Sequence, residues 1–248
     1  MEFPIRQPFD IETGTWALAL ATIRANLAAC LLVTVLLTVA HLVQYWGYGG
    51  AVLPPIRAVL LGLTGYLCHR TLVSDGALTG LGAVTEAGLR RAIRFIGLYL
   101  MILLPMLVLG LCLTIPELRT LVPRGWFVSF MMLMVVLYGV ALVLLGTALP
   151  EIAASGRVRL AAALARGRQA YRANARAMIW GPWLFGAAHA AGMLTASWAG
   201  VPAVVTEPAA GPLVLWLVVR LADSGGHVLA AALTASVLAS AWRRSRAD

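Results

Sequence analysis

The chain has 248 residues, of which 61% are hydrophobic and 12% are charged, and its net charge is +9. Soluble domains are closer to half apolar and a quarter charged. A water-soluble domain with this composition would expose large apolar patches, so the composition excludes an ordinary soluble domain. All 19 basic residues are arginines, and they lie in short segments between apolar runs, so we expect no nucleic-acid partner.

Six apolar stretches are long enough for spanning helices, which need about 20 residues. The third contains Pro105 near its middle, which predicts a kink. The sixth is over-long and contains Ser224-Gly225-Gly226, which favours a break between an interfacial piece and a shorter final span. The six predicted spans lie at about 26–48, 53–73, 95–115, 126–149, 178–200 and 213–242.

The arginines are distributed unevenly between the two sides that these six spans define. Fifteen fall on the side of both termini, and four fall on the other side, namely Arg57, Arg119, Arg124 and Arg220. Because loops rich in arginine stay on the cytoplasmic side, this count predicts that both termini are cytoplasmic.

A short motif recurs before three of the spans. The chain reads TIRAN at 22–26, AIRFI at 92–96 and AYRAN at 170–174, each time after a segment with helical character. We interpret these as three units, each a cytoplasmic amphipathic helix followed by a membrane hairpin. The sequence therefore predicts an all-α fold in which 1–248 is a single integral membrane domain. The expected surface helices are 12–24, 79–94 and 157–174, and the expected repeats are 11–75, 79–150 and 155–242.

The stretch from Ala148 to Trp183 resembles the membrane domain of glycerophosphodiester phosphodiesterases and related stand-alone bacterial six-helix proteins. The pattern is a span that ends in Leu149-Pro150, a cytoplasmic helix, and an entry into the next span at Arg172-Ala173-Asn174. The opening FDIETGTWALALATIRANLAACLL is also similar to that family. The resemblance implies six helices and proximity to lipid metabolism or membrane assembly. We expect the chain to lie in a bacterial inner membrane. It carries over no phosphodiesterase activity, because the chain contains no soluble barrel domain.

Ionisable residues inside the apolar stretches form the candidate site. Arg220, Asp223 and His227 have spacings of three and four, which place them on one face of a helix. His41, His189 and His227 lie at similar depth, ~18–22 Å from the cytoplasmic edge, and we expect that they can converge. Three interpretations stay open: an Arg–Asp pair without a functional role, a polar site for transport, and a haem or metal site.

The third cytoplasmic segment carries six arginines interleaved with apolar residues. This pattern indicates either a helix that lies on anionic headgroups or a docking surface for another membrane protein. The six are Arg157, Arg159, Arg166, Arg168, Arg172 and Arg176.

The chain contains no phosphate loop, HExxH motif or GxSxG motif, so we expect no catalytic residue, although an enzyme using scattered residues stays open. The favoured interpretation is a non-catalytic membrane subunit or assembly factor that packs against lipids and possibly other integral membrane proteins, without cofactor or metal. The first alternative is a transporter or lipid-handling protein with a polar site in the outer half of the bundle. The second is a haem- or metal-binding membrane protein.

Overall fold

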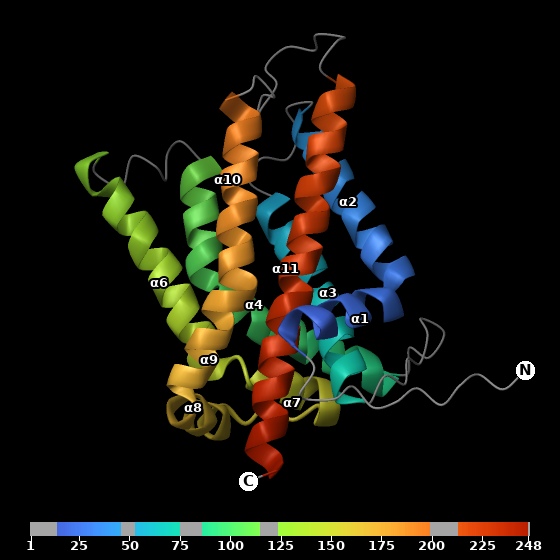
Figure 1. Cartoon of the computed structure of the whole chain (residues 1–248), viewed down its shortest axis with the longest axis vertical. Coiled ribbons are helices and arrows are strands. Elements are labelled where there is room, and N and C mark those ends of the chain that lie inside the picture. The colour runs from blue at the N-terminus through green and yellow to red at the C-terminus, as the bar shows by residue number, and fades with distance from the viewer. Residues whose placement is uncertain (1–13, 46–52, 75–85, 115–123, 199–212, 248) are drawn as a thin grey trace, which may run out of the picture.

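The computed structural model describes residues 14–45, 53–74, 86–114, 124–198 and 213–247. These residues are helical with short turns and contain no strand, which confirms the all-α fold class. The elements are α1 (Thr15–Ala25), α2 (Leu27–Tyr45), α3 (Leu53–Val73), α4 (Glu86–Thr114), η2 (Arg124–Trp126), α6 (Phe127–Leu145), α7 (Ala148–Ser155), α8 (Leu160–Gln169), α9 (Tyr171–Met178), η3 (Ile179–Trp183), α10 (Leu184–Trp198) and α11 (Leu213–Ala247). Figure 1 shows α7 and α8 at the lower end of the bundle, near the end of α11.

Three helices in the described part of the chain are long and apolar enough to cross a membrane. They contain the segments Gly88–Cys112, Phe127–Leu145 and Val214–Arg246. The bent pair α1–α2 raises the number to four when it is counted as one span. The chain is therefore a membrane protein by the length and composition of its helices, in which α4 continues through Pro105.

The first predicted surface helix corresponds to α1, which meets α2 at an angle of 88°. Asn26 is buried at this corner, where its side-chain amide donates hydrogen bonds to the Thr22 carbonyl and to Thr71 Oγ1 on α3, both at 2.9 Å. The second predicted surface helix does not form a separate element. Its described part, residues 86–94, is continuous with the span in α4, and residues 79–85 lie outside the described ranges. A single uninterrupted helix keeps every backbone hydrogen bond along this stretch.

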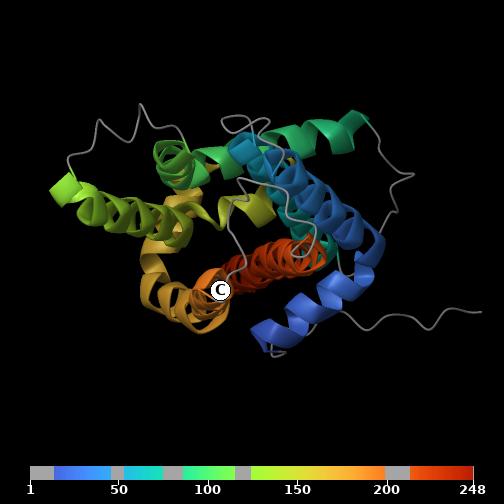
Figure 2. The same ribbon diagram turned by 90° about the horizontal axis from the view of Figure 1, so that it is seen from above.

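Helix α11 is the central element of the bundle. It contributes residues to three buried clusters, through Val228 near α2, Leu233 near α1 and α3, and Leu238 near α4 and α6. Figure 2 shows α11 with α10 on one side and α1 and α2 on the other. The predicted break at Ser224–Gly226 is wrong, because α11 is continuous from Leu213 to Ala247. Two helical glycines cost about 1 kcal/mol each, whereas a break in hydrocarbon would leave several backbone groups unsatisfied.

The fourth predicted span is shorter than the sequence suggests. Helix α6 ends at Leu145, and Leu149-Pro150 lies in the first turn of a new helix, α7. Proline is tolerated there because the first N–H groups of a helix have no partner within it. Gly156, with a φ of 71°, ends α7 in the left-handed conformation that favours glycine.

A buried ion pair and a close helix crossing fix the end of the bundle that carries α7 and α8. Glu151 in α7 is 8% exposed and accepts a 2.6 Å hydrogen bond from Arg166 in α8. Gly167 follows directly and lies against the backbone of Leu144, where an added Cβ would be 2.2 Å from the carbonyl oxygen. Because glycine has no side chain beyond a hydrogen atom, it lets α8 cross the end of α6 this closely.

We expect Gly167→Ala to lower the free energy of unfolding by about 1–3 kcal/mol, because the new methyl group overlaps backbone that cannot rotate away. Unfolding of the purified protein by SDS titration measures the change. Gly97→Ala is the matched control, since a Cβ at this helical glycine meets nothing within 4 Å. Equal stability of the two variants would contradict the close crossing.

Candidate functional site

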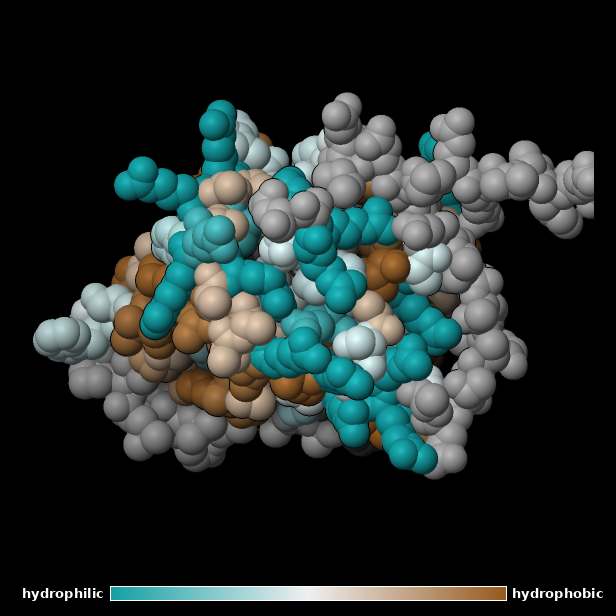
Figure 3. All heavy atoms as spheres, turned by 90° about the horizontal axis from the view of Figure 1, so that it is seen from below, coloured by the Kyte–Doolittle hydropathy of each residue, from teal (hydrophilic) through white to brown (hydrophobic). Residues whose placement is uncertain are grey.

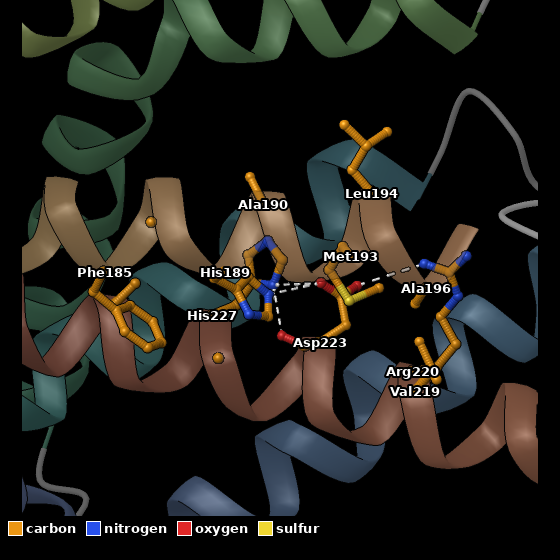
Figure 4. Close-up of a pocket in the computed structure, with 13 residues that line it drawn as sticks. Phe185, His189, Ala190, Met193, Leu194, Ala196, Val219, Arg220, Asp223 and His227 are labelled. Carbon is orange, nitrogen blue, oxygen red and sulfur yellow. Dashed lines mark hydrogen bonds and ion pairs between the residues drawn. The ribbon is translucent and has the colours of Figure 1, made fainter. Parts of the chain in front are cut away.

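The centre of the candidate site is the Asp223 carboxylate on α11, which is 6% exposed. The helical spacing brings Arg220 Nη1 to 3.7 Å from Oδ2, and His227 Nδ1 to 3.6 Å from Oδ1. The sequence places these three residues on one face of a helix, and in the structure they share the face that Figure 4 shows. Asp223 is ten residues from the start of α11, which corresponds to about 15 Å along the helix.

Two further helices each place a histidine against the same carboxylate. His189 on α10 has its Nε2 atom 3.0 Å from Oδ1, and His41 on α2 has its Nε2 atom 3.2 Å from Oδ2. The structure thus brings all five residues of the predicted polar cluster together around one acidic group. Burial of a charge in an apolar medium is unfavourable unless it is paired and hydrogen-bonded, and these contacts meet that requirement.

Arg57 on α3 is a member of the site that the sequence did not predict. Its Nη2 atom lies 2.7 Å from His41 Nδ1, so α3 is joined to Asp223 through His41. The available signal was its position among the four arginines that the sequence predicts on the side opposite the termini, two residues after Pro55. Sequence spacing could not find it, because its partner is on another helix.

The hydrogen-bond partners determine which nitrogen of each imidazole carries the proton. A guanidinium only donates, so His41 Nδ1 accepts from Arg57 and its Nε2–H donates to the carboxylate. His189 donates from Nε2 to Asp223 Oδ1, since an ionised carboxylate only accepts. His227 Nδ1 donates to the Asp223 backbone carbonyl at 2.8 Å. His189 Nδ1 and His227 Nε2 therefore carry the lone pairs that can accept a proton.

Packing around the histidines holds this arrangement. The His189 ring stacks on Phe185 at 5.8 Å between centroids and 15° between planes. The ring also lies so close to Gly226 that a Cβ there would be 2.4 Å from Cε1. The two glycines of the expected break thus have different roles, because Gly225 has nothing within 4 Å of its Cβ position.

A cleft of about 510 Å³ opens beside the cluster, between α10 and α11. Arg220, Asp223, His189 and His227 line it, and the side chain of His227 is 49% exposed. Figure 4 shows these polar side chains between the two helices. The apolar part of the lining comes from Phe185, Ala190, Met193, Leu194, Ala196, Val219 and Ala230. The volume is within the range of about 300–1,000 Å³ that is typical of small-molecule sites.

His189, Asp223 and His227 are also close enough to hold a metal ion, because their ligand atoms lie within 4.8 Å of one another. Ligands of a tetrahedral zinc ion, with bonds of about 2.0–2.1 Å, lie about 3.3 Å apart, which is comparable with the 3.0 and 3.6 Å found here. However, His189 Nε2 and His227 Nδ1, the nitrogens of this trio that face the carboxylate, are proton donors in the present network. A metal would have to displace both protons close to two arginines.

The six arginines between residues 157 and 176 do not act as one surface. Arg166 pairs with buried Glu151, which also lies 3.8 Å from Arg159. The other predicted surface residues are exposed, and Figure 3 shows hydrophilic side chains across the lower face of the molecule with apolar side chains between them. The exposed set is Arg157, Arg159, Arg168, Arg172 and Arg176.

We expect Gly226→Ala to displace the His189 imidazole and break its hydrogen bond to Asp223. Loss of a hydrogen bond to a charged group should lower the free energy of unfolding by about 1.5–3 kcal/mol. The ¹⁵N NMR signals of the histidine side chains report the displacement directly. Gly225→Ala is the control at the adjacent position, and identical histidine spectra for the two variants would refute the contact.

Comparison with known proteins finds no family model that matches the chain, no matching curated protein and no matching solved structure. The resemblance of Ala148–Trp183 to the membrane domain of glycerophosphodiester phosphodiesterases therefore stays a prediction. In the structure, its Leu149-Pro150 pair lies in the first turn of α7 instead of ending a span.

Proposed function

We propose that the chain is a transporter or lipid-handling protein that binds its ligand in the cleft between α10 and α11. The observation that carries this proposal is the position of a buried carboxylate, with two arginines and three histidines around it, at the wall of a cleft. A charged group inside a bilayer costs about 2.5 kcal/mol or more, and such groups mark binding or transport pathways. A purely structural helix contact would be made at lower cost by apolar side chains.

The proposal includes six spans, with both termini in the cytoplasm of a bacterial inner membrane. Helices α2, α3, α4, α6 and α11, together with α10 and its preceding η3 segment, coincide with the six apolar stretches of the sequence. Exposed arginines at the end that carries α8 and α9 support a cytoplasmic location for that end. Exposed apolar side chains beside them, such as Trp180, would lie among the lipid headgroups.

A bulky side chain in the cleft tests the proposal without assuming the chemistry of the ligand. Gly186 lines the cleft, and a Cβ at this position meets nothing within 4 Å. We expect the wild-type protein to retain a lipid or small molecule on purification, and Gly186→Trp to lose it because the indole occupies the cleft. Mass spectrometry of the purified proteins identifies and quantifies the bound molecule.

Gly192→Trp is the matched control, since Gly192 is on the same helix, is exposed, and lies outside the cleft lining. This variant should retain the ligand. A wild-type protein that binds nothing, or equal retention by both tryptophan variants, would overturn the proposal.

A second candidate function is that of a membrane subunit that packs against another membrane protein, and α6 favours it. Val135, Val136 and Leu137 are consecutive and all exposed, so α6 exposes an arc of about 200°. Its contacts with the bundle are concentrated near Gly139 and Leu142. Trp183 packs against Gly139, and Leu142 is buried. Figure 1 shows its upper end diverging from α10.

A photo-crosslinking residue at position 136 tests this second function in native membranes. We expect adducts with a protein, because a helix that leaves most of its circumference uncovered can pack against a partner helix. Position 32 on α2 is the control, since Leu32 is equally exposed at 54% on a helix whose opposite face is packed. Lipid adducts alone from position 136 would exclude a protein partner at α6.

A further inference from the structure

We infer that the exposed face of α9, formed by Arg172 and Arg176 and continued by Trp180, binds the headgroup of one anionic phospholipid from the surrounding bilayer. This face is not part of the lining of the cleft between α10 and α11. The inference therefore goes beyond the proposed function and does not depend on what the cleft binds.

The buried face of α9 fixes the direction in which its arginines point. Asn174 is 1% exposed, and Met178, one turn later, is 0% exposed. Arg172 and Arg176 each precede one of these residues by two positions, which is about 200° around the helix. Both arginines are accordingly exposed. The helix thus presents two positive side chains one turn apart on its outer face, at the distance of about 5–6 Å between Cβ atoms that this spacing gives.

Along this outer face the side chains change from charged to apolar. Trp180 follows Arg176 by four residues and is 65% exposed, and Leu184 follows by another four and is 51% exposed. Each interval corresponds to about 6 Å along the axis. A phospholipid presents the same order of phosphate, ester groups and acyl chains, and tryptophan is enriched at the level of the membrane interface. The face therefore matches a lipid that lies alongside α9 with its phosphate at the two arginines.

The acidic side chain at this end of the bundle does not neutralise the two arginines. Glu151 accepts a hydrogen bond from Arg166 at 2.6 Å and lies 3.8 Å from Arg159. Within the described ranges, neither Arg172 nor Arg176 forms an ion pair. Two like charges one turn apart destabilise a helix, so an anion bound between them is favourable. Guanidinium groups bind phosphate oxygens through paired hydrogen bonds, which makes a phosphodiester a suitable anion.

The apolar side chains beside the arginines favour a bilayer lipid with a net negative charge. Ile179 and Trp180 are both exposed directly after the arginines, and a phospholipid meets the charged and the apolar part of this face together. In phosphatidylcholine the positive choline group opposes the charge of the phosphate, whereas in phosphatidylglycerol it is unopposed. Attraction between arginine and anionic lipid therefore selects phosphatidylglycerol.

Quenching of tryptophan fluorescence by lipids that carry bromine on their acyl chains tests the inference. The purified protein is reconstituted into bilayers of phosphatidylglycerol and phosphatidylcholine in which only one of the two lipids is brominated. The chain has 8 tryptophans, so the difference between wild type and Trp180→Phe isolates the Trp180 signal. We expect phosphatidylglycerol to bind at Trp180 about fivefold more tightly than phosphatidylcholine, because two arginines attract it. Equal binding of the two lipids would overturn the inference.

A double substitution separates a local site from a general effect of positive charge. In Arg172→Gln/Arg176→Gln we expect the preference for phosphatidylglycerol at Trp180 to disappear. Arg244→Gln/Arg246→Gln is the matched control, because it removes the same charge from two exposed residues in the last turn of α11. This control should keep the preference. An equal loss in both double variants, or no loss in the first, would reject a site at α9.

A photo-crosslinking residue at position 173 distinguishes a lipid from a protein partner in native membranes. Ala173 is exposed and adjacent to Arg172, so a reactive group there reaches a molecule bound at this face. We expect adducts with phosphatidylglycerol or another anionic phospholipid. Adducts with a protein instead would replace the lipid with a docking partner and overturn the inference.

Discussion

The need to balance the negative charge of one carboxylate inside an apolar bundle determines how the helices around it are arranged. Asp223 is almost completely buried, so its charge is tolerated only with donors around it. Those donors come from α2, α10 and α11 directly, and from α3 through Arg57 and His41. Four helices thus meet at one acidic group. The orientation of α10 depends on this contact in particular, because its small residues leave most of its surface exposed.

The sequence predicts the helices well and their interruptions poorly. Hydropathy locates every long helix, because apolar length is a local property that does not depend on neighbours. It fails at Ser224–Gly226, where the helix continues, and at Leu149-Pro150, where a new helix begins. Glycine and proline are compatible with either outcome. Packing decides between them, through the His189 ring against Gly226 and the burial of α7 beneath the bundle.

The candidate site was predictable as a set of residues, but its network was not. Spacing on one helix gives Arg220, Asp223 and His227, and comparable depth suggests His41 and His189. Depth alone says nothing about which helices are neighbours, so Arg57 could not be included. A similar limit applies to Arg166, whose charge resembles that of the exposed arginines around it. Its pairing with Glu151 depends on α7, a helix that the hydropathy pattern does not predict.

The π-helical turn at Ile179–Trp183 has a consequence for the direction in which α10 presents its side chains. Such a turn holds about one residue more than an α-helical turn, and it accommodates Pro182 within a continuous helical path. One residue corresponds to about 100° of rotation. The turn therefore sets the direction in which the side chains of α10 point. If the same residues formed an ordinary α-helical turn there, His189 would point about a quarter of a revolution away from α11, although the sequence itself would be unchanged.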